Sequence, residues 1–304
     1  MADVKPVGRF APTPSGRMHL GNVFAALLAW LSVQSRDGEM VLRMEDLDTQ
    51  RTSADFAHIL RDDLNWLGLD WDREQSPQSQ RTAVYDAYFE QLQDRGLIYP
   101  CYCTRSQLHS VNAPHLSDGT YVYTGTCRNL VDPPVNRKPA WRVMVTDQLW
   151  TLEDKVQGHY ELNLATHCGD MVMRRADGCY VYQLAVTVDD GEAGVTEVVR
   201  GMDLLSSAPR QMYLQQLFGF PHPEYAHVPM LLAPDGRRLS KRDKDLDLGE
   251  LRRHVSRETL IGTLACAAGL IDQKCAISPE ELAKEFSWEK ITGDSIYLDA
   301  SDLL

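Results

Sequence analysis

The chain has 304 residues, of which 43% are hydrophobic, 24% are charged and 8% are aromatic. This composition is typical of globular proteins and excludes a disordered, collagenous or coiled-coil chain. Asp and Glu number 43 against 31 Lys and Arg, a net charge of −12, so any contact with nucleic acid must be local. No apolar run is long enough to span a membrane, and MADVKPVGRF lacks the apolar stretch of a secretory signal. We therefore expect a cytoplasmic protein without membrane contact.

The first part of the chain predicts alternating strands and helices. VGRFAP predicts a strand, and after the turn-rich TPSGRMHLGN the apolar residues follow a helical spacing as far as Asp37. EMVLRME predicts a second strand with Glu45 near its carboxyl end, and Ser53 is a good cap for the next helix. This alternation predicts a parallel α/β sheet, with a ligand crevice beyond the carboxyl ends of its strands.

The rest of the chain divides into further units. A helix over residues 81–95 precedes an irregular stretch that has the composition of an insertion, and MVMRR with CYVYQLAVTV predicts a hairpin around the turn at Asp177. VTEVVRG predicts a strand, PRQMYLQQLFG a helix ended by Gly219, and the tail two helical stretches. We expect two halves of a catalytic domain at residues 1–98 and 176–245, an insertion at 99–175 and a short helical region at 246–304.

The turn between the first strand and the first helix suits a phosphate ligand. It reads PTPSGRMHLGN and contains His19. A helix amino end presents unpaired N–H groups and a positive partial charge, and a histidine there can hydrogen-bond a phosphate oxygen. The plainer alternative is a capped turn with a surface histidine.

A basic loop, RRLSKR, follows much later in the chain and contains Lys241. Lysine is a compact, mobile positive charge that can stabilise a leaving pyrophosphate. By itself such a stretch is more often a solvated basic loop.

The two motifs together, in this order, resemble the HIGH and KMSKS elements of class I aminoacyl-tRNA synthetases. RFAPTPSGRMHLGN, LRMEDLDTQR, YVYQLAVTVDDGEAGVTEVVRGMDLL and RLSKR narrow the resemblance to the glutamyl-tRNA synthetase family, over residues 7–245. The resemblance implies an α/β, Rossmann-type catalytic domain that binds glutamate and ATP with Mg²⁺. It assigns a catalytic role on the phosphates to His19 and Lys241. The residues it places at ATP are His19, Gly21, Asn22, Ser240 and Lys241, and those it places at glutamate are Arg9, Ala11, Thr13, Glu45, Tyr182 and Arg200.

The chemistry of the glutamate set agrees with this assignment. A guanidinium pairs bidentately with a carboxylate, so Arg9 and Arg200 suit an acidic amino acid. Glu45 can hold an ammonium group, and Tyr182 can donate a phenolic hydrogen bond. Taken singly, the arginines could be surface ion-pair partners, Glu45 a loop carboxylate and Tyr182 a strand aromatic of the core.

Three cysteines of the irregular stretch suggest a metal site. Cys101, Cys103 and Cys127 could bind Zn²⁺ tightly as thiolates and order an insertion that has little core. The fourth ligand is open by sequence, among His109, His115, Tyr121 and Tyr123, and free buried thiols are the alternative. The family resemblance favours Tyr123 and one structural zinc ion. The remaining residues, Cys168, Cys179, Cys266 and Cys275, are expected to be small core residues.

The resemblance also addresses the substrate. Full-length members continue into a large helical anticodon-binding domain, whereas only residues 246–304 follow the basic loop here. This implies a short member with an acceptor-like zinc subdomain, which activates glutamate without tRNA and attaches it to the queuosine base of tRNA(Asp). We expect a monomer. The alternatives are a truncated enzyme that charges the 3′ end of tRNA(Glu), and an inactive tRNA-binding paralogue.

Four residues depart from the family pattern. Asn22 replaces the second histidine of HIGH, and Arg238 and Arg242 replace the first lysine and last serine of KMSKS. Asn22 still donates a hydrogen bond but cannot become cationic. Gly191 stands where many full-length members carry a histidine.

Overall fold

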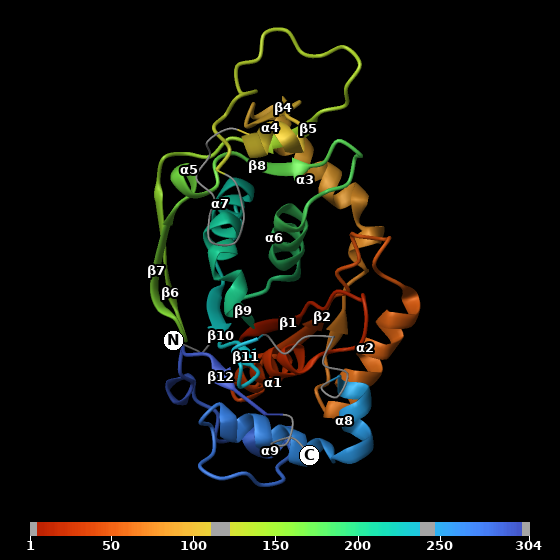
Figure 1. The fold of residues 1–304 in the computed structure, drawn as a ribbon, viewed down its shortest axis with the longest axis vertical. Helices are drawn as coiled ribbons and strands as arrows, with labels where there is room; N and C mark the ends of the chain where they lie inside the picture. Colours follow the sequence, from red (N-terminus) through yellow and green to blue (C-terminus); the bar gives the residue numbers. More distant parts are fainter. Residues whose placement is uncertain (1–4, 111–121, 238–246, 300–304) are drawn as a thin grey trace.

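The computed structural model describes residues 5–110, 122–237 and 247–299 (Figure 1). Its centre is a parallel sheet in which β1 (Val7–Phe10) pairs with β2 (Glu39–Leu42), and β2 with β3 (Arg73–Glu74). Helix α1 (Leu20–Gln34) follows β1, and α2 (Ala54–Leu67) follows β2. Ser53 caps α2, as the sequence predicts, because its side chain accepts the Phe56 N–H.

The second half of the sheet comes from distant sequence. Strand β9 (Glu197–Gly201) pairs in parallel with β10 (Glu224–Val228). It lies beside β1, where the Thr196 N–H donates to the Val7 carbonyl oxygen over 2.9 Å. The carboxyl ends of β1 and β9 therefore meet at one edge of the sheet. The flanking helices and 3-10 turns are α3 (Thr82–Asp94), α6 (Tyr182–Ala193), α7 (Ala208–Phe218), η1 (Gln78–Gln80) and η2 (Met202–Ser207).

The predicted insertion forms two antiparallel units. Strands β4 (Ile98–Cys101), β5 (Ala140–Val143) and β8 (Met171–Arg174) make one sheet. Strands β6 (Leu149–Asp154) and β7 (Gly158–Asn163) make a long hairpin. Figure 1 shows this hairpin running from the β4–β5–β8 sheet back to β10 in the central sheet. The short helices here are α4 (Arg105–Ser110) and α5 (Leu164–His167).

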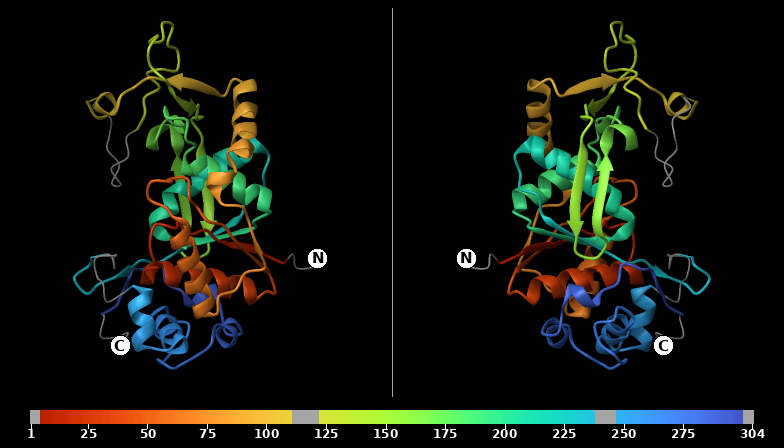
Figure 2. Two further views of the ribbon diagram at one scale, coloured as in Figure 1. Left: turned by 90° about the vertical axis from the view of Figure 1, so that its right-hand side faces the viewer. Right: turned by 90° about the vertical axis from the view of Figure 1, so that its left-hand side faces the viewer.

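The C-terminal region packs under the central sheet, on the side of α1 (Figure 2). The Trp288 indole N–H donates to Ser32 of α1 over 3.0 Å, and residues of α8 to α10 share one hydrophobic core with α1 and α2. This region therefore completes the core of the catalytic domain. Its elements are α8 (Leu248–His254), α9 (Arg257–Ala267), α10 (Pro279–Ala283), η4 (Trp288–Lys290) and β12 (Ile296–Tyr297), and β12 pairs in parallel with the preceding β11 (Leu231–Leu232).

Most predicted elements are confirmed, but the hairpin around Asp177 is wrong. Its first strand exists as β8, but the second is reduced to a bridge between Arg174 and Tyr180, after which the chain forms α6. CYVYQLAVTV is rich in β-branched and aromatic residues, which favour strands. In α6, however, Leu184, Ala185 and Val188 share one buried helix face in a hydrophobic core, so tertiary packing overrides local propensity.

The domain boundaries proposed from the sequence stay a prediction. No helix in the described part of the chain is long and apolar enough to cross a membrane.

Candidate active site

A pocket of about 860 Å³ lies at the carboxyl ends of β1 and β9, where the sequence predicts a ligand crevice. It brings together residues that are far apart in the sequence, from the amino end of α1, from β9 and from α6. Nine of the predicted site residues line it, namely Arg9, Ala11, Thr13, His19, Gly21, Asn22, Glu45, Tyr182 and Arg200.

One end of the pocket is the amino terminus of α1. His19 is the N-cap residue, and its Nδ1 accepts the N–H of Asn22 over 3.4 Å. A Cβ atom on Gly21 would come within 3.2 Å of the His19 ring, so a larger residue would crowd the imidazole. With its unpaired N–H groups and the helix dipole, this end of the pocket suits an anionic phosphate.

After the basic segment, the described part of the chain resumes beside this helix end. Ser240 and Lys241, with the variant positions Arg238 and Arg242, lie outside the described residues. Asp247, the first described residue after them, forms a β-bridge with His19, and the Leu248 N–H donates to the Met18 carbonyl oxygen over 3.2 Å.

Buried Asp63 links the same two regions through side chains. Its Oδ1 lies 3.5 Å from Arg17 in the turn before α1 and 3.2 Å from Arg252 in α8. The turn before α1 and helix α8, which follows the basic segment, are therefore linked by ion pairs through Asp63.

The other end of the pocket holds two buried guanidinium groups. Arg9 is 5% exposed and Arg200 6% exposed. The Arg9 Nη1 donates to the Val199 carbonyl oxygen over 3.0 Å, while its buried Nε has no hydrogen-bond partner among the described residues. Burial lowers the pKa of Arg9, the negative charge of Asp190 opposes this shift, and the positive charge of Arg200 adds to it. Two like charges held so close favour an anionic guest.

Glu45 and Tyr182 complete this end. Burial raises the pKa of the Glu45 carboxyl, against the opposing effect of Arg43, whose Nη2 lies 3.1 Å away. A bound ammonium group would favour the ionised carboxylate. Tyr182 begins α6 and belongs to the pocket, so its interpretation as a strand aromatic of the core is wrong.

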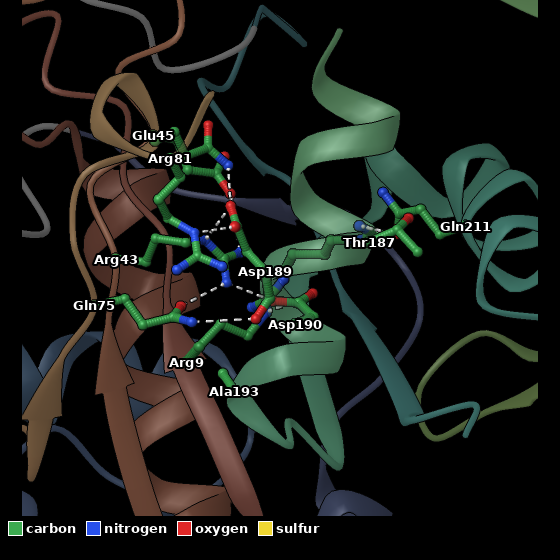
Figure 3. A network of polar contacts seen from close by, with 12 residues as sticks. Arg9, Arg43, Glu45, Gln75, Arg81, Thr187, Asp189, Asp190, Ala193 and Gln211 are labelled. Atoms are coloured by element: carbon green, nitrogen blue, oxygen red, sulfur yellow. Dashed lines mark hydrogen bonds and ion pairs between the residues drawn. The ribbon is translucent and has the colours of Figure 1, made fainter. Parts of the chain in front are cut away.

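Behind the pocket lies an ion-pair network that the sequence analysis missed (Figure 3). The fully buried Arg43 donates from Nη1 to Asp190 over 2.7 Å and lies 3.7 Å from Asp189. Asp190 also lies 3.7 Å from Arg9. The network therefore connects β1, β2 and α6 under the glutamate end. The available signal was the pair Asp189 and Asp190 directly after the mostly apolar YQLAVTV, because consecutive buried acids need partners.

The predicted metal site is assembled from β4, the residues after it, and the segment around Tyr123. The sulfur atoms of Cys101, Cys103 and Cys127 lie within 4.8 Å of one another, and that of Cys103 is 3.5 Å from that of Cys127. The Tyr123 oxygen lies 3.4 Å from the Cys101 sulfur and 3.9 Å from the Cys103 sulfur. A tetrahedral zinc site with Zn–S near 2.3 Å and Zn–O near 2.0 Å requires about 3.8 Å between sulfurs and about 3.5 Å between sulfur and oxygen. The Cys103–Cys127 distance and the two tyrosine–sulfur distances are within about 0.4 Å of that spacing.

Two neighbouring donors, Arg142 and the Cys127 N–H, favour anionic ligands at the cluster, whereas burial opposes them. Arg142 donates from Nε to the Cys101 sulfur over 3.3 Å, and its guanidinium carbon lies 3.8 Å from the centre of the Tyr123 ring. The Cys127 N–H donates to the Tyr123 oxygen over 2.9 Å, which would stabilise a phenolate. Burial and the neighbouring sulfurs raise the pKa of Cys103 to about 12, so the thiolate needs a cation beside it.

The structure does not describe the side chains of the other three possible fourth ligands. His115 and Tyr121, and the side chain of His109, are outside the described residues.

The prediction for the remaining cysteines is partly wrong. Cys168 is buried and Cys266 half-buried, but Cys179 and Cys275 are exposed. Cys179 lies next to the turn at Gly178, where the backbone passes over the surface.

The comparisons with known proteins agree with this geometry. Residues 5–294 match the family described as "tRNA synthetases class I (E and Q), catalytic domain". A glutamyl-Q tRNA(Asp) synthetase of Symbiobacterium thermophilum is 42% identical over 97% of both chains, and one of Nitratidesulfovibrio vulgaris is 41% identical over 90% of both. A crystal structure of a glutamate tRNA ligase from Elizabethkingia meningosepticum in complex with its amino acid has a TM-score of 0.84 and 28% identity, over 99% of this chain and 68% of that one. On these matches, and with its pocket at the carboxyl ends of β1 and β9, the chain belongs to the class I tRNA synthetase family (E and Q).

Proposed function

We propose that this protein activates glutamate with ATP, without tRNA, and transfers the glutamyl group to the queuosine base at the wobble position of tRNA(Asp). The observation that carries the proposal is the pocket itself, in which two buried guanidinium groups and Glu45 lie beside the phosphate-binding end of α1. Relatives named glutamyl-Q tRNA(Asp) synthetase, matched over nearly their whole length, support the choice of acceptor.

In the first step a carboxylate oxygen of glutamate attacks the α-phosphorus of ATP, which enters as its Mg²⁺ complex. The bond to the β-phosphate oxygen breaks, and glutamyl-adenylate and pyrophosphate form. Arg9 and Arg200 hold the dicarboxylate and Glu45 its ammonium group. His19 hydrogen-bonds a phosphate oxygen as charge develops, and Lys241 stabilises the departing pyrophosphate.

In the second step a hydroxyl of the queuosine cyclopentene ring attacks the carbonyl carbon of the mixed anhydride. The ester forms, the bond to the phosphate oxygen breaks, AMP leaves, and the hydroxyl proton passes to solvent or to the departing phosphate. No covalent enzyme intermediate is needed, so positioning and charge stabilisation dominate.

Cys101, Cys103, Tyr123 and Cys127 would hold one zinc ion. It supplies structural cross-linking of the insertion, because four protein ligands leave no open position for chemistry.

The deciding experiment uses ATP, radiolabelled glutamate and tRNA(Asp) with or without queuosine. We expect label only on the queuosine-containing RNA, and equally on RNA that lacks its 3′-terminal adenosine. Pyrophosphate exchange that depends on glutamate should proceed without RNA. Label at the 3′ end of tRNA(Glu) would instead identify an enzyme that charges tRNA(Glu), and no exchange would identify an inactive paralogue.

The role of Lys241 can be separated from that of the glutamate pocket. We expect Lys241→Ala to slow adenylate formation at least about 100-fold while glutamate binding changes little, because the lysine acts on charge that develops only in the transition state. Equal loss of both would contradict this role.

A further inference from the structure

We propose that Asp154 and His227 form a positioning pair that orients Arg200 for the amino acid. The inference rests on the proposed function, since it makes Arg200 a ligand of the substrate carboxylate. Neither Asp154 nor His227 lines the pocket, so each acts through Arg200.

Asp154 fixes one side of the His227 ring. Both side chains are fully buried, and the Asp154 Oδ2 lies 2.6 Å from the His227 Nδ1. The Asp154 Oδ1 already accepts the N–H groups of Val156 and Gln157 over 3.0 and 2.9 Å. Burial favours protonation of Asp154, but the hydrogen bonds from His227 and the backbone outweigh it and lower the pKa. An ionised carboxylate only accepts, so Nδ1 must carry the ring proton.

Arg200 fixes the other side of the ring. Its Nε donates to the His227 Nε2 over 3.0 Å. A guanidinium has no acceptor, so Nε2 must be unprotonated and the imidazole neutral. Burial lowers the pKa of His227, which agrees with a neutral ring. Both neighbours therefore impose the same tautomer.

The pair leaves Arg200 with a defined set of free donors. Nη1 donates to Gln211 over 2.9 Å, and Nη2 to the Leu204 carbonyl oxygen over 3.2 Å. Three of the five guanidinium N–H groups are thus held by the protein, and the other two, one on each Nη, have no partner among residues 5–110, 122–237 and 247–299 and are left for a carboxylate. Without His227 the Nε edge would be released and the plane of the guanidinium could turn.

The topology makes this pair a link between the insertion and the pocket. Asp154 ends β6 of the long hairpin, whereas His227 lies on β10 and Arg200 on β9. The hairpin is fastened there by the Lys155 N–H to the Tyr225 carbonyl oxygen over 2.9 Å, and by Gln157 to the His227 carbonyl oxygen over 2.9 Å. The position of the hairpin therefore sets the orientation of Arg200.

The first test is Asp154→Asn. The oxygen of the new Asn side chain can keep the hydrogen bonds from the backbone, while its NH₂ group faces the His227 Nδ1. The ring proton must then move to Nε2, where it faces the Nε–H of Arg200. In glutamate-dependent pyrophosphate exchange we expect the KM for glutamate to rise about 10- to 100-fold, and the KM for ATP to stay within about 2-fold. A parallel rise of both would overturn the proposal.

A matched pair of variants tests His227 even if Asp154→Asn does not fold. Gln has the reach of Nε2 and can still accept from Arg200, whereas Asn has the reach of Nδ1 and contacts only Asp154. We expect His227→Gln to stay within about 5-fold of the unchanged protein in KM for glutamate, and His227→Asn to lose at least about 10-fold. Equal effects of the two would show that His227 only fills space.

The tautomer can be read without any activity. In nitrogen-15 spectra of the whole protein, with His227 assigned from the His227→Gln variant, we expect a protonated Nδ1 and a bare Nε2. A protonated Nε2 overturns the proposal. If the unchanged protein shows no glutamate-dependent exchange, the proposed function fails, while these spectra still decide the tautomer.

Discussion

Removal of one charge from the ion-pair network behind the pocket tests how much this network contributes to the stability of the fold. Asp190→Asn keeps an oxygen that can accept from the Arg43 Nη1, 2.7 Å away, but deletes the carboxylate charge. Loss of one partner of a buried ion pair costs about 3–5 kcal/mol. Arg43 keeps Glu45 at 3.1 Å and Asp189 at 3.7 Å, so we expect the lower end, about 3 kcal/mol.

The assay is thermal unfolding. At roughly 2–4 °C per kcal/mol for a chain of this size, the midpoint should fall by about 6–12 °C. The matched control is Asp177→Asn, the same substitution in an exposed pair with Arg175, which should cost at most about 1 kcal/mol. Similar shifts in the two variants would refute the reasoning, because the network would then contribute no more than a surface pair.

Three further predictions follow from single contacts. Glutamate affinity should fall as the pH drops through the raised pKa of Glu45, because the protonated carboxyl cannot hold an ammonium group. In exchange assays, Glu45→Gln should raise the KM for glutamate at least about 10-fold and remove this pH dependence. Cys103→Ser should weaken zinc retention at least about 100-fold in chelator competition, whereas Cys266→Ser, outside the cluster, should leave it unchanged. Gly191→Ala would place a Cβ 2.4 Å from the Phe220 ring, so we expect a loss of about 1–3 kcal/mol in urea unfolding despite the better helix propensity, and recovery in the double variant with Phe220→Leu.

The proximity of Phe220 also gives a structural reason for Gly191 at a position where many full-length members carry a histidine. The ring of Phe220 occupies the space that a side chain at this position would need. A histidine here, as in many full-length members, would require another residue or another ring position at Phe220.

Much of the pocket could be predicted because its residues sit in local motifs. His19 lies at a strand-to-helix turn, and Arg9 and Glu45 lie on or just after strands whose carboxyl ends must share an edge. The strand and turn pattern indicated the positions of His19 and Glu45, whereas the assignment of Arg9 to the glutamate site came from the family resemblance. The cysteine cluster was predictable for a similar reason, since thiols in a segment without a core have few other uses.

The partners of the residues that hold these groups could not be predicted. Asp190, Asp154 and His227 act through contacts between segments more than 70 residues apart, such as the 2.6 Å contact of Asp154 with His227. Buried charges carry no periodic signal, and their partners follow only from the tertiary fold. The helix α6 was missed for the same reason, because its strand-like residues are placed by the core they join.

The arrangement of charges accounts for both halves of the proposed selectivity. Arg43 lies among Glu45, Asp189 and Asp190, so its charge is neutralised within the protein. Among the described residues, Arg9 has only Asp190 as an ion-pair partner, 3.7 Å from its Nε, and this buried Nε has no hydrogen-bond partner. A dicarboxylate supplies the acceptors that such a guanidinium lacks, whereas an amide in its place would bring donors against donors. Sites of this kind reject the wrong analogue by the cost of leaving buried polar groups unpaired. If Arg9 binds the substrate as proposed, we therefore expect glutamate to be favoured over glutamine, because only the dicarboxylate supplies acceptors to every donor of this guanidinium.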